Sequence, residues 1–228
     1  MQYYKDIDRL SIYLDLSTFC NAGCPQCNRT SIYGLSKWNW IPNRMWTIDR
    51  IKKAYPRELN IGKVTMCGTW GDPFMVKDVE KMIYYFLEND CEVKVNTNAS
   101  MREPLYWYEL GVRSSELGHL EIFFDVDGID NEMHAKYRRK TELDKVLENM
   151  EAFTLGGGKA RVHTIVFEHN EKYLKEIRDL ALSKGAHEVT FQKSNRYFHN
   201  GEFHFEDEKG NPDTLRRSDI GLDQALSG

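Results

Sequence analysis

Three of the five cysteines crowd into one short stretch, STFCNAGCPQCNRT, at Cys20, Cys24 and Cys27. Soft thiolates grouped in this way select zinc or an iron–sulfur cluster. Both groups usually take four protein ligands, yet no fourth Cys or His follows at the spacing of a ligand pair. Cys67 and Cys91 stand singly in apolar stretches, where a cysteine is more often a small buried hydrophobe than a ligand. If the bound group is a cluster, the missing ligand leaves one iron open to a small molecule.

The composition excludes several classes of function. The chain has 228 residues, of which 41% are apolar and 29% charged, as expected for one larger globular domain or two small ones. A net charge of −4 gives neither the basic surface of a nucleic-acid-binding protein nor the polybasic segment of a membrane-surface protein. We find no apolar run of transmembrane length and no apolar core of a signal peptide. An odd number of cysteines, three of them crowded, fits a reducing compartment, so we expect a cytoplasmic protein.

The elements that must position the cysteines alternate along the chain. Six β-rich apolar segments predict strands at residues 10–16, 62–68, 91–98, 120–128, 160–169 and 187–192. Amphipathic patterns predict helices at residues 76–90, 103–117, 141–158 and 170–185. This alternation indicates an α/β fold with a parallel sheet, closed or partly closed into a barrel.

The last part of the chain has a different composition. Residues 198–228 are polar and rich in Gly and Asp, with only a brief alternation of Phe. We expect a hairpin or loop followed by a loose tail. The predicted domains are therefore a core over residues 1–197 and a polar C-terminal extension over residues 198–228.

Each motif of chemical interest follows a predicted strand. The cysteine loop follows the first strand, GTWGDP follows the second, NTN ends the third and DVDG ends the fourth. In βα folds the functional residues gather at the carboxyl ends of the strands. We therefore expect the four motifs, which lie far apart in the sequence, to share one rim of the sheet.

Taken together, the four motifs resemble those of the radical S-adenosylmethionine (radical SAM) enzymes, over about residues 10–197. The resemblance implies a partial (β/α)6 barrel of the TIM type, with a [4Fe–4S] cluster bound by Cys20, Cys24 and Cys27. The amino and carboxylate groups of S-adenosylmethionine (SAM) would chelate the fourth iron. One-electron reductive cleavage of SAM would give a 5′-deoxyadenosyl radical that abstracts a hydrogen from an unidentified substrate. A low-potential electron donor of the flavodoxin or ferredoxin type is the implied partner.

The resemblance also assigns residues to SAM binding. The run Trp70, Gly71, Asp72 and Pro73 resembles the Gly-Gly-Glu-Pro motif that receives the SAM amino group, although its first glycine is replaced by Trp and its acid is shorter. Three further positions resemble polar strand-end residues that face SAM: Asn96, Asn98 and Asp125. Gln26 stands where the family usually has an aromatic residue whose backbone meets the adenine. All eight are predicted to be cofactor-binding residues.

Two charged residues connect the chain to one branch of the family. Asp127, followed by Gly128, resembles the Asp-Gly step of the peptide-modifying branch and is the candidate catalytic residue. Arg138 in HAKYRRK is the candidate partner of the SAM carboxylate, because a guanidinium suits bidentate recognition. Peptides and proteins are thus the expected substrate class. Members of this branch often carry an auxiliary-cluster domain of the SPASM or twitch type; no cysteine follows Cys91, so we expect none in this chain.

The same motifs also allow plainer interpretations. Gly-Asp-Pro is common turn chemistry, and Asp125, Asp127 and Asn98 could serve as caps or turn residues. Arg138 could belong to a solvated charged face. The alternative function is a non-catalytic binding domain stabilised by zinc or by a cluster. Three aromatic residues of the loop after the cysteines belong either to the core or to a substrate lid: Trp38, Trp40 and Trp46.

Overall fold

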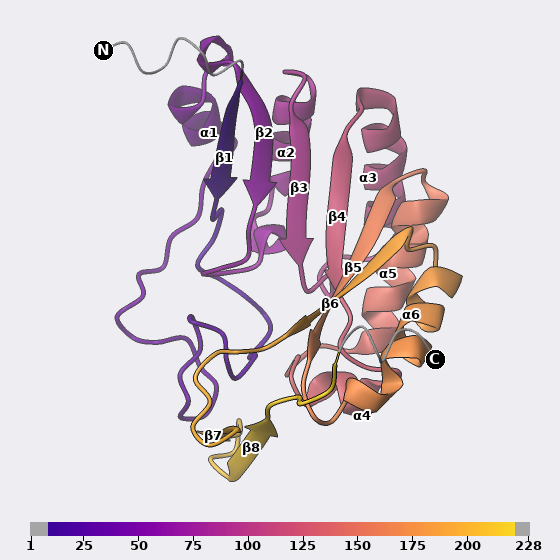
Figure 1. Ribbon diagram of the computed structural model, residues 1–228. Coiled ribbons are helices and arrows are strands. Elements are labelled where there is room, and N and C mark those ends of the chain that lie inside the picture. Colours follow the sequence, from indigo (N-terminus) through magenta and orange to yellow (C-terminus); the bar gives the residue numbers. More distant parts are fainter. Residues whose placement is uncertain (1–8, 222–228) are drawn as a thin grey trace.

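A computed structural model describes residues 9–221. Six parallel strands form one sheet in the order β1-β2-β3-β4-β5-β6 (Figure 1). Their bounds are β1 Leu10–Leu14, β2 Ile61–Met66, β3 Glu92–Thr97, β4 Leu120–Asp125, β5 Lys159–Val166 and β6 Glu188–Lys193. All six predicted strands and the parallel α/β architecture are confirmed.

Helices cover one face of this sheet (Figure 1). They are α1 Ile48–Ala54, α2 Val79–Leu87, α3 Pro104–Leu117, α4 Asn131–Ala135, α5 Leu143–Leu155 and α6 Leu174–Ser183. The four predicted helices correspond to α2, α3, α5 and α6, whereas α1 and α4 were not predicted because seven and five residues are too short to show a helical period. Within residues 9–221 every helix is too short or too polar to cross a bilayer.

The main core lies between the sheet and the helices. Val93, Val95 and Phe124 point from the strands toward this core and are fully buried. Trp107 of α3 packs on Phe124 with ring centroids 5.3 Å apart, and Phe153 of α5 completes the aromatic layer. Because strand side chains alternate between faces, the residues between these core positions point to the other face. That face is polar and leads to the carboxyl rim.

A hairpin extends the chain beyond the sheet. Strands β7 (Glu202–Glu206) and β8 (Pro212–Arg216) pair antiparallel and lie below the carboxyl ends of the sheet (Figure 1). The buried side chains of Phe203, Phe205 and Leu215 join a second hydrophobic cluster with Phe167, at the end of β5, and with Cys24. The hairpin thus packs on the cysteine loop. The predicted loose tail lies outside the described residues from 222 onward, and the domain boundary at residue 197 stays a prediction.

Candidate functional site

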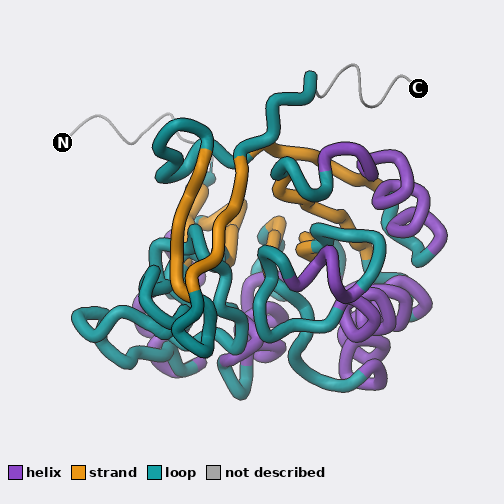
Figure 2. The backbone as a smooth tube through the Cα atoms, turned by 90° about the horizontal axis from the view of Figure 1, so that it is seen from below, coloured by secondary structure: helices purple, strands orange, loops and turns teal. Residues whose placement is uncertain are grey.

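A cavity of about 610 Å³ opens at the carboxyl ends of the strands, the end that Figure 2 shows surrounded by loops. Eight of the residues assigned from the sequence line it: Cys20, Cys24, Cys27, Asp72, Asn96, Asn98, Asp125 and Arg138. The other five, Gln26, Trp70, Gly71, Pro73 and Asp127, are not part of this lining. The fold therefore brings the four motifs to one rim, with eight of the thirteen assigned residues lining one cavity.

The three thiols share this cavity, and polar groups approach two of them. Asn98 Nδ2 donates toward Cys20 Sγ at 3.6 Å, and Arg138 Nη1 lies 3.9 Å from Cys24 Sγ. Burial, reinforced by Asp72, raises the pKa of Cys20 to about 12, and burial raises that of Cys24 as well. A bound metal group would supply the positive charge that makes these thiols ionise. Donors aimed at sulfur stabilise thiolates, so the residues present fit an iron–sulfur cluster.

The remaining cysteines differ from each other. Cys91 is buried, as predicted, and its Sγ lies 3.1 Å from the carbonyl of Ile61. Cys67 is not the buried hydrophobe that we expected, because the end of β2 carries it to the cavity wall. Its Sγ contacts the carbonyl of Leu14 at 3.5 Å and the carboxylate of Asp15 at 3.9 Å. The thiol of Cys67 is thus directed to the end of β1.

A single metal ion would need its ligands to converge on one point. Within residues 9–221, no group of three or more His, Cys, Asp and Glu side chains is arranged to hold one ion. In a cubane cluster each thiolate binds a different iron, so three cysteines of such a site need not converge in this way. The placement of Cys20, Cys24 and Cys27 around one cavity is compatible with that requirement.

Asp72 ties together the ends of two strands. Its Oδ1 accepts from the backbone N–H of Phe74 at 2.9 Å, and its Oδ2 accepts from that of Asn98 at 2.8 Å. Thr97 Oγ1 donates to the same carboxylate at 2.9 Å. Burial raises the pKa of Asp72, and these donors oppose the rise. Asp72 therefore faces the cavity with both oxygens already bonded and holds the NTN segment against the GTWGDP loop.

Gly71 lies where this loop crosses the cysteine loop. A Cβ at this position would be 2.4 Å from the carbonyl oxygen of Ser17 and 2.5 Å from that of Phe19, closer than real contacts allow. The next residue, Asp72, donates its backbone N–H to the carbonyl of Phe19 at 2.8 Å. Glycine at position 71 is therefore a packing requirement that lets the two loops meet. Pro73 is buried and starts the short 3-10 helix Pro73–Met75.

Asp15 is a site residue that the sequence reasoning missed. Its Oδ1 accepts from the backbone N–H groups of Thr69 at 2.9 Å and Trp70 at 3.2 Å. Burial raises the pKa of this carboxyl, against the effect of these two donors. The side chain of Trp70 itself turns outward and packs edge-on against Trp40, with ring centroids 5.7 Å apart. Asp15 directly follows β1, which ends at Leu14, but the predicted strand ran to residue 16 and so placed Asp15 inside the strand and not at the rim.

Arg138 is held by two carboxylates. Its Nη1 pairs with Asp125 Oδ2 at 2.8 Å and its Nε with Asp127 Oδ2 at 2.5 Å. Burial raises the pKa of Asp125 to about 7 even though Arg138 opposes the rise. Asp127 is completely buried, and its Oδ1 accepts from the backbone N–H of Ile165 at 2.6 Å. Asp127 thus lies beneath Arg138, a geometry that suits positioning of the guanidinium more than contact with a substrate.

A buried histidine completes the support under Arg138. His134 Nδ1 accepts from the backbone N–H of Asp127 at 3.2 Å, so the ring proton is on Nε2, 3.1 Å from Thr141 Oγ1. Thr141 in turn donates to the carbonyl of Arg138 at 2.6 Å. Burial lowers the pKa of His134 to about 4 and keeps the ring neutral. Helix α4 therefore serves to fix the segment that carries Arg138.

The other lining residues come from the face of the strands that points away from the main core. Phe123, His163, Ile165, Thr190 and Gln192 line the cavity from β4, β5 and β6. In β4 and β5 they alternate with buried residues, as Phe123 does with Phe124, and in β6 with the partly buried Val189 and Phe191. Extending the alternation back from Asp125 by two residues would have placed Phe123 on the same face.

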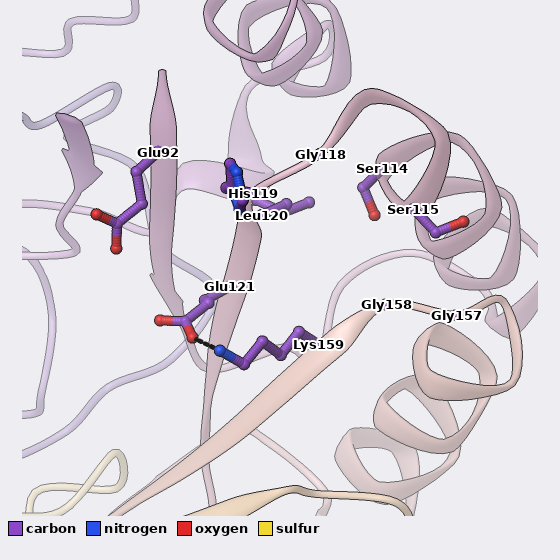
Figure 3. A pocket seen from close by; sticks show the side chains of 10 residues that line it. All are labelled: Glu92, Ser114, Ser115, Gly118, His119, Leu120, Glu121, Gly157, Gly158 and Lys159. Carbon is purple, nitrogen blue, oxygen red and sulfur yellow. Dashed lines mark ion pairs between the residues drawn. The ribbon is translucent and has the colours of Figure 1, made fainter. Parts of the chain in front are cut away.

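A second hollow, of about 390 Å³, lies at the opposite ends of β3, β4 and β5. Glu121 forms an ion pair there with Lys159 (Figure 3). The same carboxylate pairs with Lys94 at 3.2 Å and lies 3.6 Å from Arg161. Glu121 thus joins three cations from the two neighbouring strands, and these ion pairs hold β3, β4 and β5 together at this end of the sheet.

Fold and site define a class of protein: a partial α/β barrel with three thiols and a polar cavity at the carboxyl ends of its strands. The radical SAM superfamily profile matches residues 14–181, and the chain belongs to that superfamily. This confirms the family that the motifs indicated.

Individual relatives agree with this assignment. An AdoMet-dependent heme synthase of Methanosarcina barkeri (strain Fusaro / DSM 804) is 22% identical over 173 residues, which are 75% of this chain and 47% of that protein. SuiB of Streptococcus suis bound to S-adenosylmethionine has a TM-score of 0.66 at 14% identity, over 83% of this chain and 41% of that one. The structure of anSMEcpe with bound AdoMet has a TM-score of 0.62 at 15% identity, over 81% and 50%. The two structures share the fold, and the chain spans about half the length of these relatives.

Proposed function

We propose that the chain is a radical SAM enzyme that binds a [4Fe–4S] cluster through Cys20, Cys24 and Cys27 and binds SAM beside it. The observation that carries the proposal is the placement of three thiols on one cavity, together with Asn98 and Arg138 donors directed at two of the sulfurs. When bound, the reduced cluster and SAM supply one-electron cleavage of the sulfonium and a radical able to abstract a hydrogen atom from substrate.

The residues of this chain would bind and orient these groups. A guanidinium has five N–H donors, and Asp125 and Asp127 occupy two of those of Arg138. The second donor of Nη1 lies toward Cys24, which leaves the two donors of Nη2 for a carboxylate such as that of SAM. Asn96 and Asn98 add amide groups to the cavity wall. Both carboxylate oxygens of Asp72 already accept hydrogen bonds from the protein, so we assign to Asp72 a structural role in the cavity wall. Backbone groups of its loop would then bind the SAM amino group.

For the substrate we propose a peptide or protein. Two structural neighbours support this class: SuiB has been solved bound to the precursor peptide SuiA, and anSMEcpe with AdoMet and a Kp18Cys peptide. Room for a substrate lies along the polar face of β4 to β6, where Phe123, His163 and Gln192 continue the cavity. A low-potential flavodoxin or ferredoxin as electron donor, the cytoplasm as compartment, and a core domain ending at residue 197 complete the proposal.

Anaerobic reconstitution with iron and sulfide tests the proposal. We expect about four irons and four sulfides per chain, and 5′-deoxyadenosine after addition of dithionite and SAM. Cys24→Ala should lose both the cluster and this product. Cys91→Ala, which alters a buried cysteine remote from the rim, is the matched control and should retain both. One zinc without sulfide would instead support the non-catalytic binding domain, and full iron in Cys24→Ala would contradict the ligand assignment.

A further inference from the structure

We propose that Gln26 is a positioning residue that holds the segment Ser194–Tyr197 against the cysteine loop as one wall of the cofactor cavity. The inference rests on the proposed function and concerns the residue of the CNAGCPQC stretch that departs from the family pattern. Ser194, Asn195 and Arg196 line the cavity directly after β6, and Cys27 lines it beside Gln26. The cysteine loop and the segment after β6 are joined by a hydrogen bond between Gln26 and Arg196, which lie 170 positions apart in the chain.

Both ends of the Gln26 amide are used in this contact. Its Nε2 donates to the backbone carbonyl of Arg196 at 2.6 Å, and its Oε1 accepts from Ser194 Oγ at 2.5 Å. The side chain is 1% exposed. The Arg196 carbonyl fixes the orientation of the amide because it can only accept: a flipped amide would set its own oxygen against that carbonyl oxygen, whereas the Ser194 hydroxyl can donate or accept. The side chain of Gln26 therefore holds the segment after β6 in place through two hydrogen bonds.

A second contact anchors the far end of the segment. Tyr197 Oη donates to Asn28 Oδ1 at 2.5 Å, and Tyr197 has a backbone φ of 60°. At the near end, the backbone N–H of Ser194 bonds to the carbonyl of Val166 at 3.4 Å. Between these anchors Asn195 and Arg196 are exposed. The segment thus has little packing of its own and depends on hydrogen bonds to the cysteine loop.

An apolar residue at position 26 would leave these partners without hydrogen bonds. The Ser194 hydroxyl and the Arg196 carbonyl would lose their partner, and a buried polar group without one is unfavourable. An aromatic residue cannot replace the amide, because its ring offers neither donor nor acceptor in the required places. Since the exposed part of the segment has few other contacts, the loss should open this wall locally and leave the core intact.

The test compares Gln26→Leu, Ser194→Ala and the double variant with the wild-type protein, reconstituted anaerobically. Tyr85→Phe is the control, because it removes a side-chain hydrogen bond, to the carbonyl of Tyr55 at 2.8 Å, in α2 away from the cavity. The readouts are iron and sulfide content, the SAM dissociation constant, and amide hydrogen exchange of residues 194–199.

We expect Gln26→Leu to keep its iron, to weaken SAM binding about tenfold and to speed exchange in residues 194–199 about tenfold, which corresponds to about 1.4 kcal/mol. Ser194→Ala should show the same changes in smaller measure, and the double variant should be no worse than Gln26→Leu, because the two residues share one contact. Tyr85→Phe should leave all three readouts unchanged.

Unchanged exchange of residues 194–199 in Gln26→Leu, or fully additive effects in the double variant, would overturn the inference. This outcome is distinct from a failure of the proposed function. If the wild-type chain bound no cluster or no SAM, hydrogen exchange of the segment would still decide whether Gln26 holds it.

Discussion

Arg138 offers a quantitative test, because it neutralises a carboxylate that has no access to water. Asp127 is completely buried and the Arg138 side chain is 11% exposed. Removing one partner of a buried ion pair costs about 3–5 kcal/mol, since the other charge is left without compensation. For Arg138→Met we expect a loss of that size in the free energy of unfolding. With a urea m-value of about 3 kcal/mol/M, the midpoint should fall by about 1 M or more.

The neighbouring arginine provides the matched control. Arg139 pairs with Asp213 and with Glu208, but its side chain is 20% exposed and those partners are 40% and 31% exposed. Pairs of this kind contribute about 0.2–1 kcal/mol, so Arg139→Met should change the midpoint little. Urea unfolding followed by circular dichroism, at matched iron content, measures both variants. Equal losses for the two adjacent arginines would refute the reasoning.

A second change tests the cause of the loss. Of the two carboxylates that Arg138→Met leaves unpaired, Asp127 is the completely buried one; Asp127→Asn in that background removes its charge but keeps an oxygen to accept from the backbone N–H of Ile165. We expect the double variant to regain more than half of the lost free energy. If Asp127→Asn simply adds a further loss, the destabilisation arises from packing and not from the charge.

Three further predictions concern residues that support the rim or the sheet. Burial holds the pKa of His134 at about 4, below its ordinary value of 6.5, so the contribution of the neutral ring to the free energy of unfolding is complete above pH 6.5 and is lost as the pH falls from 6.5 through 4. Urea unfolding over this range should show a loss on the order of 3 kcal/mol, and His134→Gln should reduce that loss. Burial favours a higher pKa for Glu121, but Lys159, Lys94 and other cations hold it at about 2. The contribution of its carboxylate to the free energy of unfolding is therefore present above pH 4.5 and lost as the pH falls through 2, and Glu121→Gln should reduce the pH dependence of that free energy between those values. Gly71→Ala should lose most of its reconstituted iron, whereas Gly68→Ala, whose Cβ would lie 3.4 Å from the Gly71 carbonyl, should keep it; equal iron in the two would contradict the crossing of the loops.

The sequence predicted the sheet well because its signals are local. Val93 and Val95 alternate with polar residues, and the helices between strands begin and end at recognisable residues such as Pro104 and Gly156. The location of the site at one rim of the sheet could be predicted from the topology alone, since parallel strands bring their carboxyl ends together. Helices α1 and α4 were missed because they are one or two turns long and owe their form to tertiary contacts.

The details of the site depended on contacts that a linear pattern does not contain. Gln26 bonds to a segment about 170 residues away, so nothing near it in the sequence revealed its partner. Asp127 lies two residues beyond the end of β4, where the turn and not the strand period decides its direction, and it points under Arg138. Cys67 stood in an apolar run, but it follows the last residue of β2 and therefore reaches the cavity.

Because the hairpin β7–β8 comes late in the chain, the cysteine loop is synthesised well before the residues that cover it. Cys24 leaves the ribosome early, whereas Phe203, Phe205 and Leu215, which pack around it, follow roughly 180 to 190 residues later. At about 5–20 residues per second, the cysteine loop spends roughly 10 to 40 seconds without this cover. The nascent chain thus exposes its thiols to the metals and oxidants around it before its last strands can shield them.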